Sequence, residues 1–316
     1  MRRALSVPGN VLLLGEYAVT EPGGLGIALG SGPRALGESE PAEELSLTAR
    51  FGAEERRWPE EPLPLVEVAL DALAEEGIAP EPQRLEIDTS RFYRGGRKLG
   101  FGSSAAATVL LTAHLLSAAP EATLPEKEEL FHLALKVHRR LQGGRGSGYD
   151  VAASIWGGTI TFAGGKRPEV KRAELSWLPR LYALAGREAV KSGSALESYN
   201  RWKVERPEEG KRFLRRSNEL VREVLSAESW EKGAAHLKEA KRLGEELGRR
   251  IGVNGSFRLT EKMKQHNILH CDRGPVLIKS VGAGSEMGVL FTPCEVEERG
   301  VEAVELSQNE EGLRWE

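Results

Sequence analysis

Apolar residues in the first half of the chain follow two different spacings. Val11–Leu14 is a short, continuous apolar run after Pro8-Gly9, which is typical of a buried strand that begins at a turn. Residues 45–51 and 84–88 alternate apolar and polar positions, as strands with one buried face do. Leu65–Glu76 carries its apolar residues at helical spacing. The first half is therefore predicted to mix strands with helices.

Glycine, serine and proline mark the limits of further elements. Pro125 to Gln142 is predicted to be a helix with proline at its start and Gly143-Gly144 at its end. Residues 105–118 have a strong helix pattern, and we expect a serine at its N-cap. The other expected elements are helices at 150–156, 206–226 and 229–250 and strands at 159–162, 177–185, 276–281, 288–291 and 301–306. Helices followed by strands in the second half indicate an α+β architecture.

Length and charge set bounds on the organisation and on the partners. A chain of 316 residues suggests two domains, which we expect over residues 1–170 and 171–316. The net charge is −3 and no block of lysine and arginine stands out, so we expect no nucleic-acid partner. The oligomeric expectation is a monomer or a homodimer.

Cysteine and apolar content point to a cytoplasmic protein. Cys271 and Cys294 lack a CxxC spacing, and we expect two reduced structural thiols rather than a disulfide or a zinc site. No stretch approaches the ~20 apolar residues of a membrane span, and the first residues lack the apolar length of a signal peptide. We therefore expect a cytoplasmic location and no membrane partner.

The segment Lys98 to Ala106 carries the clearest chemistry. Its two glycines allow the backbone to approach a ligand, and a helix begins directly after them. The first turn of a helix offers unpaired N–H groups and the positive end of its dipole, which suits a phosphate. Ser104 is a candidate to place its hydroxyl on Mg²⁺. No Gly-Lys-Ser/Thr follows, so this is not the Walker pattern, and the spacing does not fit the dinucleotide fingerprint.

Three segments together resemble the signatures of the GHMP kinases. Gly-Phe-Gly-Ser-Ser-Ala-Ala at 100–106 is similar to the second signature, residues 8–19 to the first and residues 279–288 to the third, in the family's order. The resemblance implies an N-terminal domain like ribosomal protein S5 domain 2 and a ferredoxin-like C-terminal domain, with the site between them. It also implies ATP and Mg²⁺ as cofactors and a small-molecule acceptor.

Within that superfamily the chain most resembles the phosphomevalonate kinases. His138 to Ala153 looks like their pattern His-x-x-x-Gln-Gly followed by Gly-Ser-Gly-x-Asp-Val-Ala-Ala. Lys98 matches a lysine before their phosphate loop, and Tyr17 stands where mevalonate kinases usually have His. A phosphate monoester has a second pKa near ~6 and is already an anion, so its kinase needs cations more than a base. The resemblance therefore implies phosphorylation of a phosphorylated acceptor, (R)-5-phosphomevalonate.

The resemblance also assigns roles to individual residues. Lys98 and Asp150 are the expected catalytic residues, although Asp150 also suits a helix N-cap. The nucleotide phosphates would lie on Gly100, Phe101, Gly102, Ser103, Ser104, Ala105 and Ala106. The acceptor would be bound by Asn10, Glu16, Tyr17, His138, Gln142, Arg145, Ser147, Gly148, Ser192, Ser194, Lys279, Ala283 and Gly284. For Ser192 and Ser194 an ordinary loop is an equal alternative, and His138 with Gln142 also suits a structural hydrogen bond.

Two departures from the family pattern keep alternatives open. Asn10 stands where phosphomevalonate and mevalonate kinases usually have Lys, and it brings no charge. Ser285-Glu286 interrupts the usual Gly-Gly-Gly-Asp ending of the third signature. The alternatives are a mevalonate kinase, a mevalonate-phosphate decarboxylase, or an inactive relative that binds nucleotide.

Overall fold

The chain forms two compact units, each built from separate stretches of sequence. The computed structural model describes residues 2–117, 123–186, 192–266, 268–282, 287–296 and 303–316. The first unit comprises Met1–Val11, Leu29–Ile160 and Asn309–Glu316, and the second comprises Leu12–Ala28 and Thr161–Gln308. The domain boundary expected near residue 170 stays a prediction.

An eight-stranded sheet has the order β14-β1-β2-β5-β3-β4, with β8 on β2 and β9 on β8. Strands β3 and β5 are parallel, while β2–β5, β3–β4 and β1–β14 are antiparallel. The strands are β1 (Arg3–Leu14), β2 (Leu25–Pro41), β3 (Ser46–Phe51), β4 (Glu54–Trp58), β5 (Gln83–Asp88), β8 (Gly158–Ala163), β9 (Glu169–Arg172) and β14 (Arg314–Trp315). The long strands β1 and β2 each have residues in both units.

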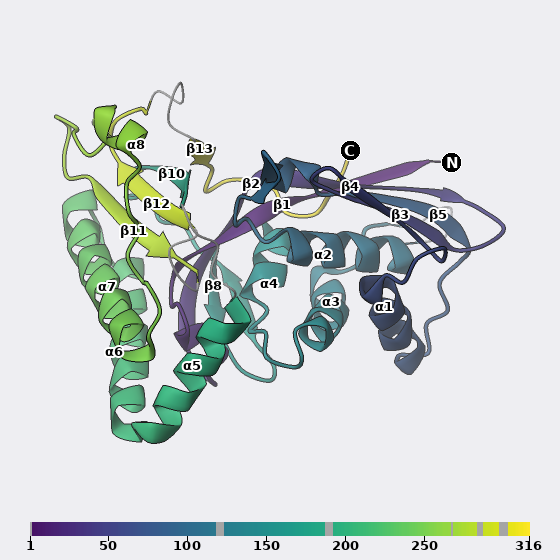
Figure 1. The fold of residues 1–316 in the computed structure, drawn as a ribbon, viewed down its shortest axis with the longest axis horizontal. Helices are drawn as coiled ribbons and strands as arrows, with labels where there is room; N and C mark the ends of the chain where they lie inside the picture. The colour runs from purple at the N-terminus through teal and green to yellow at the C-terminus, as the bar shows by residue number, and fades with distance from the viewer. Residues whose placement is uncertain (1, 118–122, 187–191, 267, 283–286, 297–302) are drawn as a thin grey trace. The chain divides into compact units, whose positions relative to one another are not determined.

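Four helices of the first unit cover one face of its sheet (Figure 1). They are α1 (Pro64–Glu75), α2 (Ser103–Leu116), α3 (Lys127–Leu141) and α4 (Tyr149–Trp156). Helix α2 is apolar on almost all sides, and it packs on β5 and on the three other helices, as a central helix must. Helix α3 buries Leu130, Ala134 and Val137, which recur at helical spacing, and leaves its charged face outside. Two short 3₁₀ turns, η1 (Ala18–Thr20) and η2 (Ser90–Phe92), lie in the connections.

Residues 309–316 belong to the first unit and return to β1, its first strand in sequence. In β14, Trp315 pairs with Leu5 and Arg314 with Ser6 of β1. The Arg34 side chain, 12% exposed, donates to the Glu310 carboxylate and to the carbonyl oxygens of residues 311 and 312, each at 2.8 Å. The segment is therefore tied to the sheet by one half-buried guanidinium as well as by its own strand.

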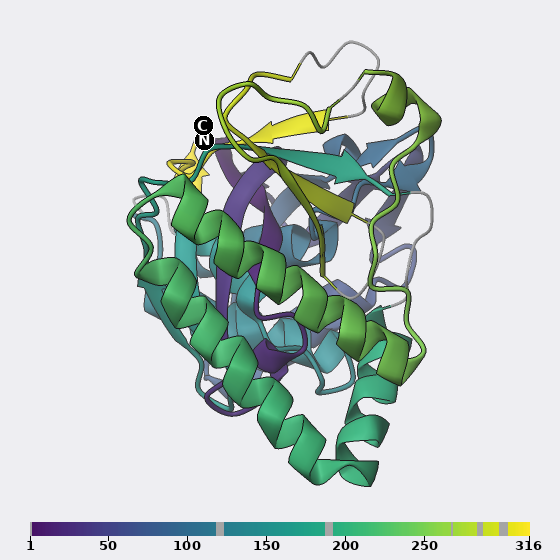
Figure 2. The ribbon, with the colours of Figure 1, turned by 90° about the vertical axis from the view of Figure 1, so that its left-hand side faces the viewer.

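The second unit contains an antiparallel sheet in the order β11-β12-β10-β13. Its strands are β10 (Arg180–Ala185), β11 (Leu277–Val281), β12 (Met287–Thr292) and β13 (Ala303–Leu306). Its helices are α5 (Ser192–Glu205), α6 (Pro207–Leu225), α7 (Trp230–Ile251) and α8 (Glu261–Gln265). Helices α6 and α7 lie side by side and α7 packs on β11 (Figure 2). The expected helices are present, α5 and α8 were not expected, and the α+β class is confirmed.

Three local expectations are wrong. Pro8-Gly9 is no turn but lies inside β1, and proline is tolerated there because β14 pairs only with Leu5 and Ser6 and ends before it. The loop that was the alternative for Ser192 and Ser194 is not found, since α5 begins at Ser192. Cys271 and Cys294 are not free thiols: they form a disulfide, with their Cα atoms 5.8 Å apart. Within the described ranges, no helix is both long and apolar enough to cross a membrane.

Candidate active site

The expected phosphate loop, residues 100–106, includes the first turn of α2. Gly102 occupies the N-cap position with φ 72°, a left-handed conformation that favours glycine. No side chain caps this helix, so the expectation of a serine N-cap is wrong: Ser103 and Ser104 are the first two helical residues. Ser104 is exposed. The first-turn amides of α2 therefore have no side-chain cap as an acceptor, the arrangement found where a helix N-terminus binds an anion.

Asn10 lies directly beneath this loop. A Cβ atom on Gly102 would come within 2.3 Å of Asn10 Nδ2, which explains why the position has no side chain. The Asn10 amide donates to Ser154 Oγ of α4 at 3.3 Å, and its backbone N–H donates to the Phe101 carbonyl at 2.9 Å. Asn10 is only 3% exposed. It therefore supports the loop from below.

Phe101 has its side chain in the core rather than at the loop surface. It is 2% exposed and lies against the positions of Gly9 and Gly32, where an added Cβ would be 2.9 and 2.6 Å from its atoms. Glycine at both positions makes room for the ring. Phe101 thus offers a ligand its backbone and anchors the loop with its ring.

Lys98 stands on a small exposed hairpin before the loop. The hairpin consists of β6 (Tyr93–Arg94) and β7 (Arg97–Lys98), and Lys98 pairs with Tyr93. Its Nζ lies 5.8 Å from the centre of the Tyr93 ring, a cation–π contact that leaves its charge available. Lys98 is exposed, and no ion pair holds it within the described part of the chain.

Asp150 is bonded to a buried histidine. It lies in the first turn of α4, after Gly148 at the N-cap, and its Oδ1 accepts the Val151 N–H at 3.0 Å. Its Oδ2 lies 2.9 Å from His138 Nε2. His138, on α3, is only 1% exposed and also meets Gln142, whose Nε2 is 2.8 Å away. We infer that His138 acts on the site through Asp150 and has no surface to offer an acceptor.

The loop between α3 and α4 is held by a residue that the sequence reading missed. Arg139 donates from Nε to the Gly146 carbonyl at 3.0 Å and from Nη2 to the Ser147 carbonyl at 3.1 Å. Burial lowers the pKa of its guanidinium. Arg145 is exposed on this loop. The only signal for Arg139 in the sequence was its place one turn before the glycine pair that ends α3.

In the second unit, two expected acceptor residues bind each other. Lys279 on β11 is 3% exposed, and its Nζ forms an ion pair with Glu16 and donates to the Ser280 carbonyl at 3.1 Å. With Tyr17 they line a hollow whose opposite wall includes Gly244 and Gly248 of α7. Lys279 is thus committed to Glu16, and we expect it to order this wall.

Tyr17 adopts a strained backbone conformation in that wall. Its φ of 63° and ψ of −41° lie in a sparsely populated region for a residue with a side chain. Its ring packs on Tyr199 with centroids 5.2 Å apart. Burial, and then the charge of Glu16, raise the pKa of its phenol to about 12. Such strain persists only where the surroundings impose it, which makes Tyr17 a fixed part of the hollow.

Of the remaining expected residues, two lie in α5 and two lie outside the described residues. Ser192 and Ser194 lie in the first turn of α5, and Ser194 is exposed. Ala283 and Gly284, like Ser285-Glu286, lie outside the described residues. Among those that are described, no group of three His, Cys, Asp or Glu side chains is arranged to hold a metal ion alone.

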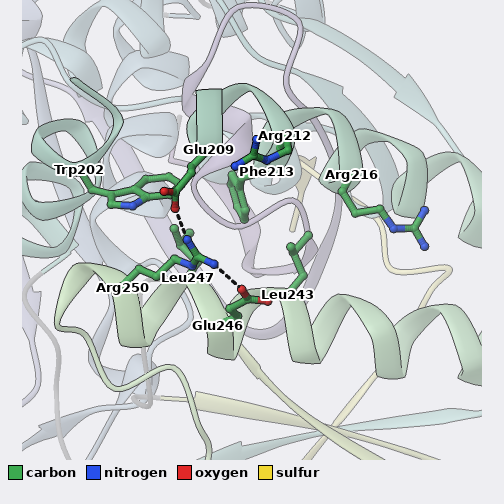
Figure 3. Close-up of a pocket in the computed structure, with 9 residues that line it drawn as sticks. All are labelled: Trp202, Glu209, Arg212, Phe213, Arg216, Leu243, Glu246, Leu247 and Arg250. Atoms are coloured by element: carbon green, nitrogen blue, oxygen red, sulfur yellow. Dashed lines mark hydrogen bonds and ion pairs between the residues drawn. The ribbon is translucent and has the colours of Figure 1, made fainter. Parts of the chain in front are cut away.

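A second hollow, of about 200 Å³, lies among α5, α6 and α7 and contains none of the expected site residues (Figure 3). Trp202, Phe213 and Leu247 form part of its apolar wall. Arg250 pairs with Glu209 and with Glu246, the latter at 2.7 Å. The charge of Arg250 in the lining of this hollow is thus neutralised by two ion pairs within the protein.

Comparison with known proteins identifies the family. The model of the GHMP kinases N terminal domain matches residues 65–158, which include the phosphate loop and Asp150. A phosphomevalonate kinase of Saccharolobus solfataricus is 25% identical over 334 residues, covering 99% of this chain and 98% of the relative. The resemblance to the GHMP kinase superfamily expected from the sequence is thereby confirmed.

Solved structures show the same fold. A Lin0012 protein from Listeria innocua has a TM-score of 0.83 at 23% identity, over 100% of this chain and 99% of that one. The Streptococcus pneumoniae phosphomevalonate kinase in complex with phosphomevalonate and AMPPNP has a TM-score of 0.72 at 19% identity, over 92% of both chains. The two-domain GHMP fold expected from the sequence is thereby confirmed.

Proposed function

We propose that this chain transfers the γ-phosphoryl group of ATP to (R)-5-phosphomevalonate, giving ADP and 5-diphosphomevalonate for isoprenoid synthesis. A bond forms between an oxygen of the acceptor phosphate and the γ-phosphorus, while the bond from that phosphorus to the β–γ bridging oxygen breaks. Similarity to the Saccharolobus phosphomevalonate kinase along nearly the whole length of both chains supports the choice.

The observation that carries the proposal is the exposed cation Lys98 at the entrance to the phosphate loop. An acceptor phosphate is already ionised near neutral pH, since its second pKa is about 6. Transfer between two anionic groups depends mainly on positioning and on cations that offset their repulsion. We assign that charge to Lys98, between donor and acceptor, and assign Arg145 and Ser147 to the acceptor phosphate.

The phosphate loop would hold the nucleotide. Its uncapped first turn presents backbone N–H groups and the positive end of the α2 dipole to the polyphosphate. Mg²⁺ takes few protein ligands beside substrate phosphates and water, which fits the exposed Ser104 hydroxyl and the lack of a protein-only cage among the described residues. The ion would supply further neutralisation of phosphate charge.

The deciding experiment measures ADP release with phosphomevalonate and with mevalonate side by side. We expect turnover with phosphomevalonate and little with mevalonate. Faster turnover of mevalonate would place the chain in another branch of the superfamily. Tight binding of ATP with no turnover of any acceptor would instead identify an inactive relative.

Substitution of Lys98 tests the mechanism. We expect Lys98→Met to abolish turnover with no change in melting temperature, because the side chain is exposed and outside the core. Arg94→Met, on the paired strand of the same hairpin, removes an exposed cation without removing the bridge and should retain activity. Full activity of the Lys98 variant would exclude the bridging role.

A further inference from the structure

A continuous chain of polar contacts joins Asp150 to the phosphate-loop helix through the interior. His138 Nε2 faces Asp150 Oδ2 at 2.9 Å, and His138 Nδ1 faces Thr108 Oγ1 at 3.5 Å. Thr108 Oγ1 in turn donates its proton to the Ser104 carbonyl at 2.9 Å. All of these residues belong to the first unit. Figure 1 shows α2, α3 and α4, which carry them, as neighbours.

The partners determine which protons the histidine ring carries. A hydroxyl has one proton, and Thr108 uses it on Ser104, so only its lone pairs remain for His138 Nδ1. An ionised carboxylate can only accept, so Nε2 must donate to Asp150. Both ring nitrogens therefore face acceptors, and a histidine that donates from both is an imidazolium.

Gln142 fits this arrangement in one orientation. Its Nε2 lies 2.8 Å from His138 Nε2, and two N–H groups cannot face each other at that distance. Rotating the Gln142 side-chain amide by 180° exchanges its oxygen and nitrogen, which have almost the same shape. The oxygen then faces His138 Nε2 and serves as a second acceptor for the imidazolium.

The contacts around His138 and Asp150 favour the charged form of both side chains. Burial by itself would lower the pKa of His138, but the charge and hydrogen bond of Asp150 outweigh it and raise that pKa. Burial would raise the pKa of Asp150, but His138 and the first-turn amide of Val151 lower it. The carboxylates at the end of α1, Glu75 and Glu76, pair with cations at the surface instead, so Asp150 is the charged group that reaches the ring.

We propose that His138 is a buried, protonated counter-charge of Asp150 at neutral pH, so that Asp150 positions the acceptor and does not serve as a general base. This inference rests on the proposed function and narrows the acceptor to a group that arrives already ionised. A free alcohol would find no base here, because the carboxylate that could take its proton is held by an imidazolium. His138 is then a positioning residue, which acts on the acceptor by neutralising the negative charge of Asp150.

The first test reads the ring directly and needs no activity. Protein labelled with ¹⁵N at its histidines gives separate signals for protonated and bare ring nitrogens, and His138→Gln identifies the signals of residue 138. We expect both nitrogens of His138 to carry protons at pH 7. A bare nitrogen at that pH would overturn the proposal.

The second test is a double-mutant cycle on the acceptor KM. His138→Gln leaves Asp150 as an uncompensated anion beside an anionic acceptor, and we expect the KM for phosphomevalonate to rise about tenfold or more from that repulsion, with a smaller change in the KM for ATP. His138→Gln combined with Asp150→Asn removes both charges and should recover most of the acceptor KM. His132→Gln, an exposed position on the same helix, is the matched control and should change neither constant.

The outcomes separate the inference from the function on which it rests. A purely structural role for His138 predicts no recovery in the double variant, and that result would overturn the proposal. If the wild-type protein turns over no phosphomevalonate, the proposed function fails, and the nuclear magnetic resonance experiment alone decides the charge of His138.

Discussion

Replacing Gly102 by alanine perturbs the phosphate loop at the point where β1 supports it. Gly102 has φ 72°, and a left-handed conformation costs a residue with a Cβ about 1–2 kcal/mol. The new Cβ would also lie 2.3 Å from Asn10 Nδ2, so the Asn10 side chain must move. Moving it breaks its buried hydrogen bond to Ser154, which costs about 1–3 kcal/mol. The expected loss of stability is therefore about 2–5 kcal/mol.

A matched variant separates the two causes. Gly96 lies in the turn of the β6–β7 hairpin with φ 77°, and nothing lies within 4 Å of where its Cβ would be. Gly96→Ala should therefore lose only the conformational part, about 1–2 kcal/mol. The assay is a urea titration followed by far-UV circular dichroism, with slope and midpoint fitted together.

A second background tests whether Asn10 is responsible. In the presence of Gly102→Ala the Asn10 side chain is already displaced, so adding Asn10→Ala should cost little more, and the two effects should not add. If Gly102→Ala is no more destabilising than Gly96→Ala, or if the two effects add fully, the contact with Asn10 does not impose glycine at position 102.

Three further predictions concern charge pairs and the disulfide. Lys279→Met should cost about 3–5 kcal/mol of unfolding free energy because it leaves Glu16, whose side chain is only 15% exposed, without this partner, and Glu16→Gln in the same chain should restore most of it. Cys271→Ser should cost about 3 kcal/mol, measured against wild type in oxidising and in reducing buffer, because the bond closes a loop with a sequence separation of 23. The His138–Asp150 pair should stabilise the fold most between the unfolded-state pKa values of 3.8 and 6.5. The stabilisation from His138, whose folded-state pKa is raised, is complete below 6.5 and is lost as the pH rises through that folded-state pKa. The stabilisation from Asp150, whose folded-state pKa is lowered, is complete above 3.8 and is lost as the pH falls through that folded-state pKa. Urea midpoints of wild type and His138→Gln across pH check this, and a constant difference would contradict it.

Periodicity predicted the long helices α6 and α7 well because their buried faces repeat every three to four residues, whereas α5 and α8 were not predicted. Helix α7 was expected at 229–250 and is found at Trp230–Ile251, with Ser229 as its cap. The Pro8-Gly9 turn was wrong because a strand limit depends on the neighbouring strands, and β1 continues through these residues beside β2, which begins only at Leu25. Local turn residues cannot report such a distant partner.

The candidate site was predictable as a set of motifs but not as a set of roles. The glycine–serine pattern indicated the phosphate loop and the family resemblance indicated Lys98 and Asp150, yet neither gave a sign that Lys279 is bound to Glu16 or that Asn10 supports Gly102. Those relations join segments that are far apart in sequence, and only the packed structure reveals them. The disulfide was missed for a related reason: a count of two cysteines carries no information on whether folding brings them within bonding distance.

The return of residues 309–316 to β1 has a consequence for how the protein is made. The first unit gains its edge strand, and Arg34 gains its acceptors, only when these residues have left the ribosome. Until then the edge of β1 at Leu5 and Ser6 is open to pairing with other nascent chains. The edge of β1 therefore stays unpaired by β14 through most of synthesis and becomes protected only after residues 309–316 have emerged.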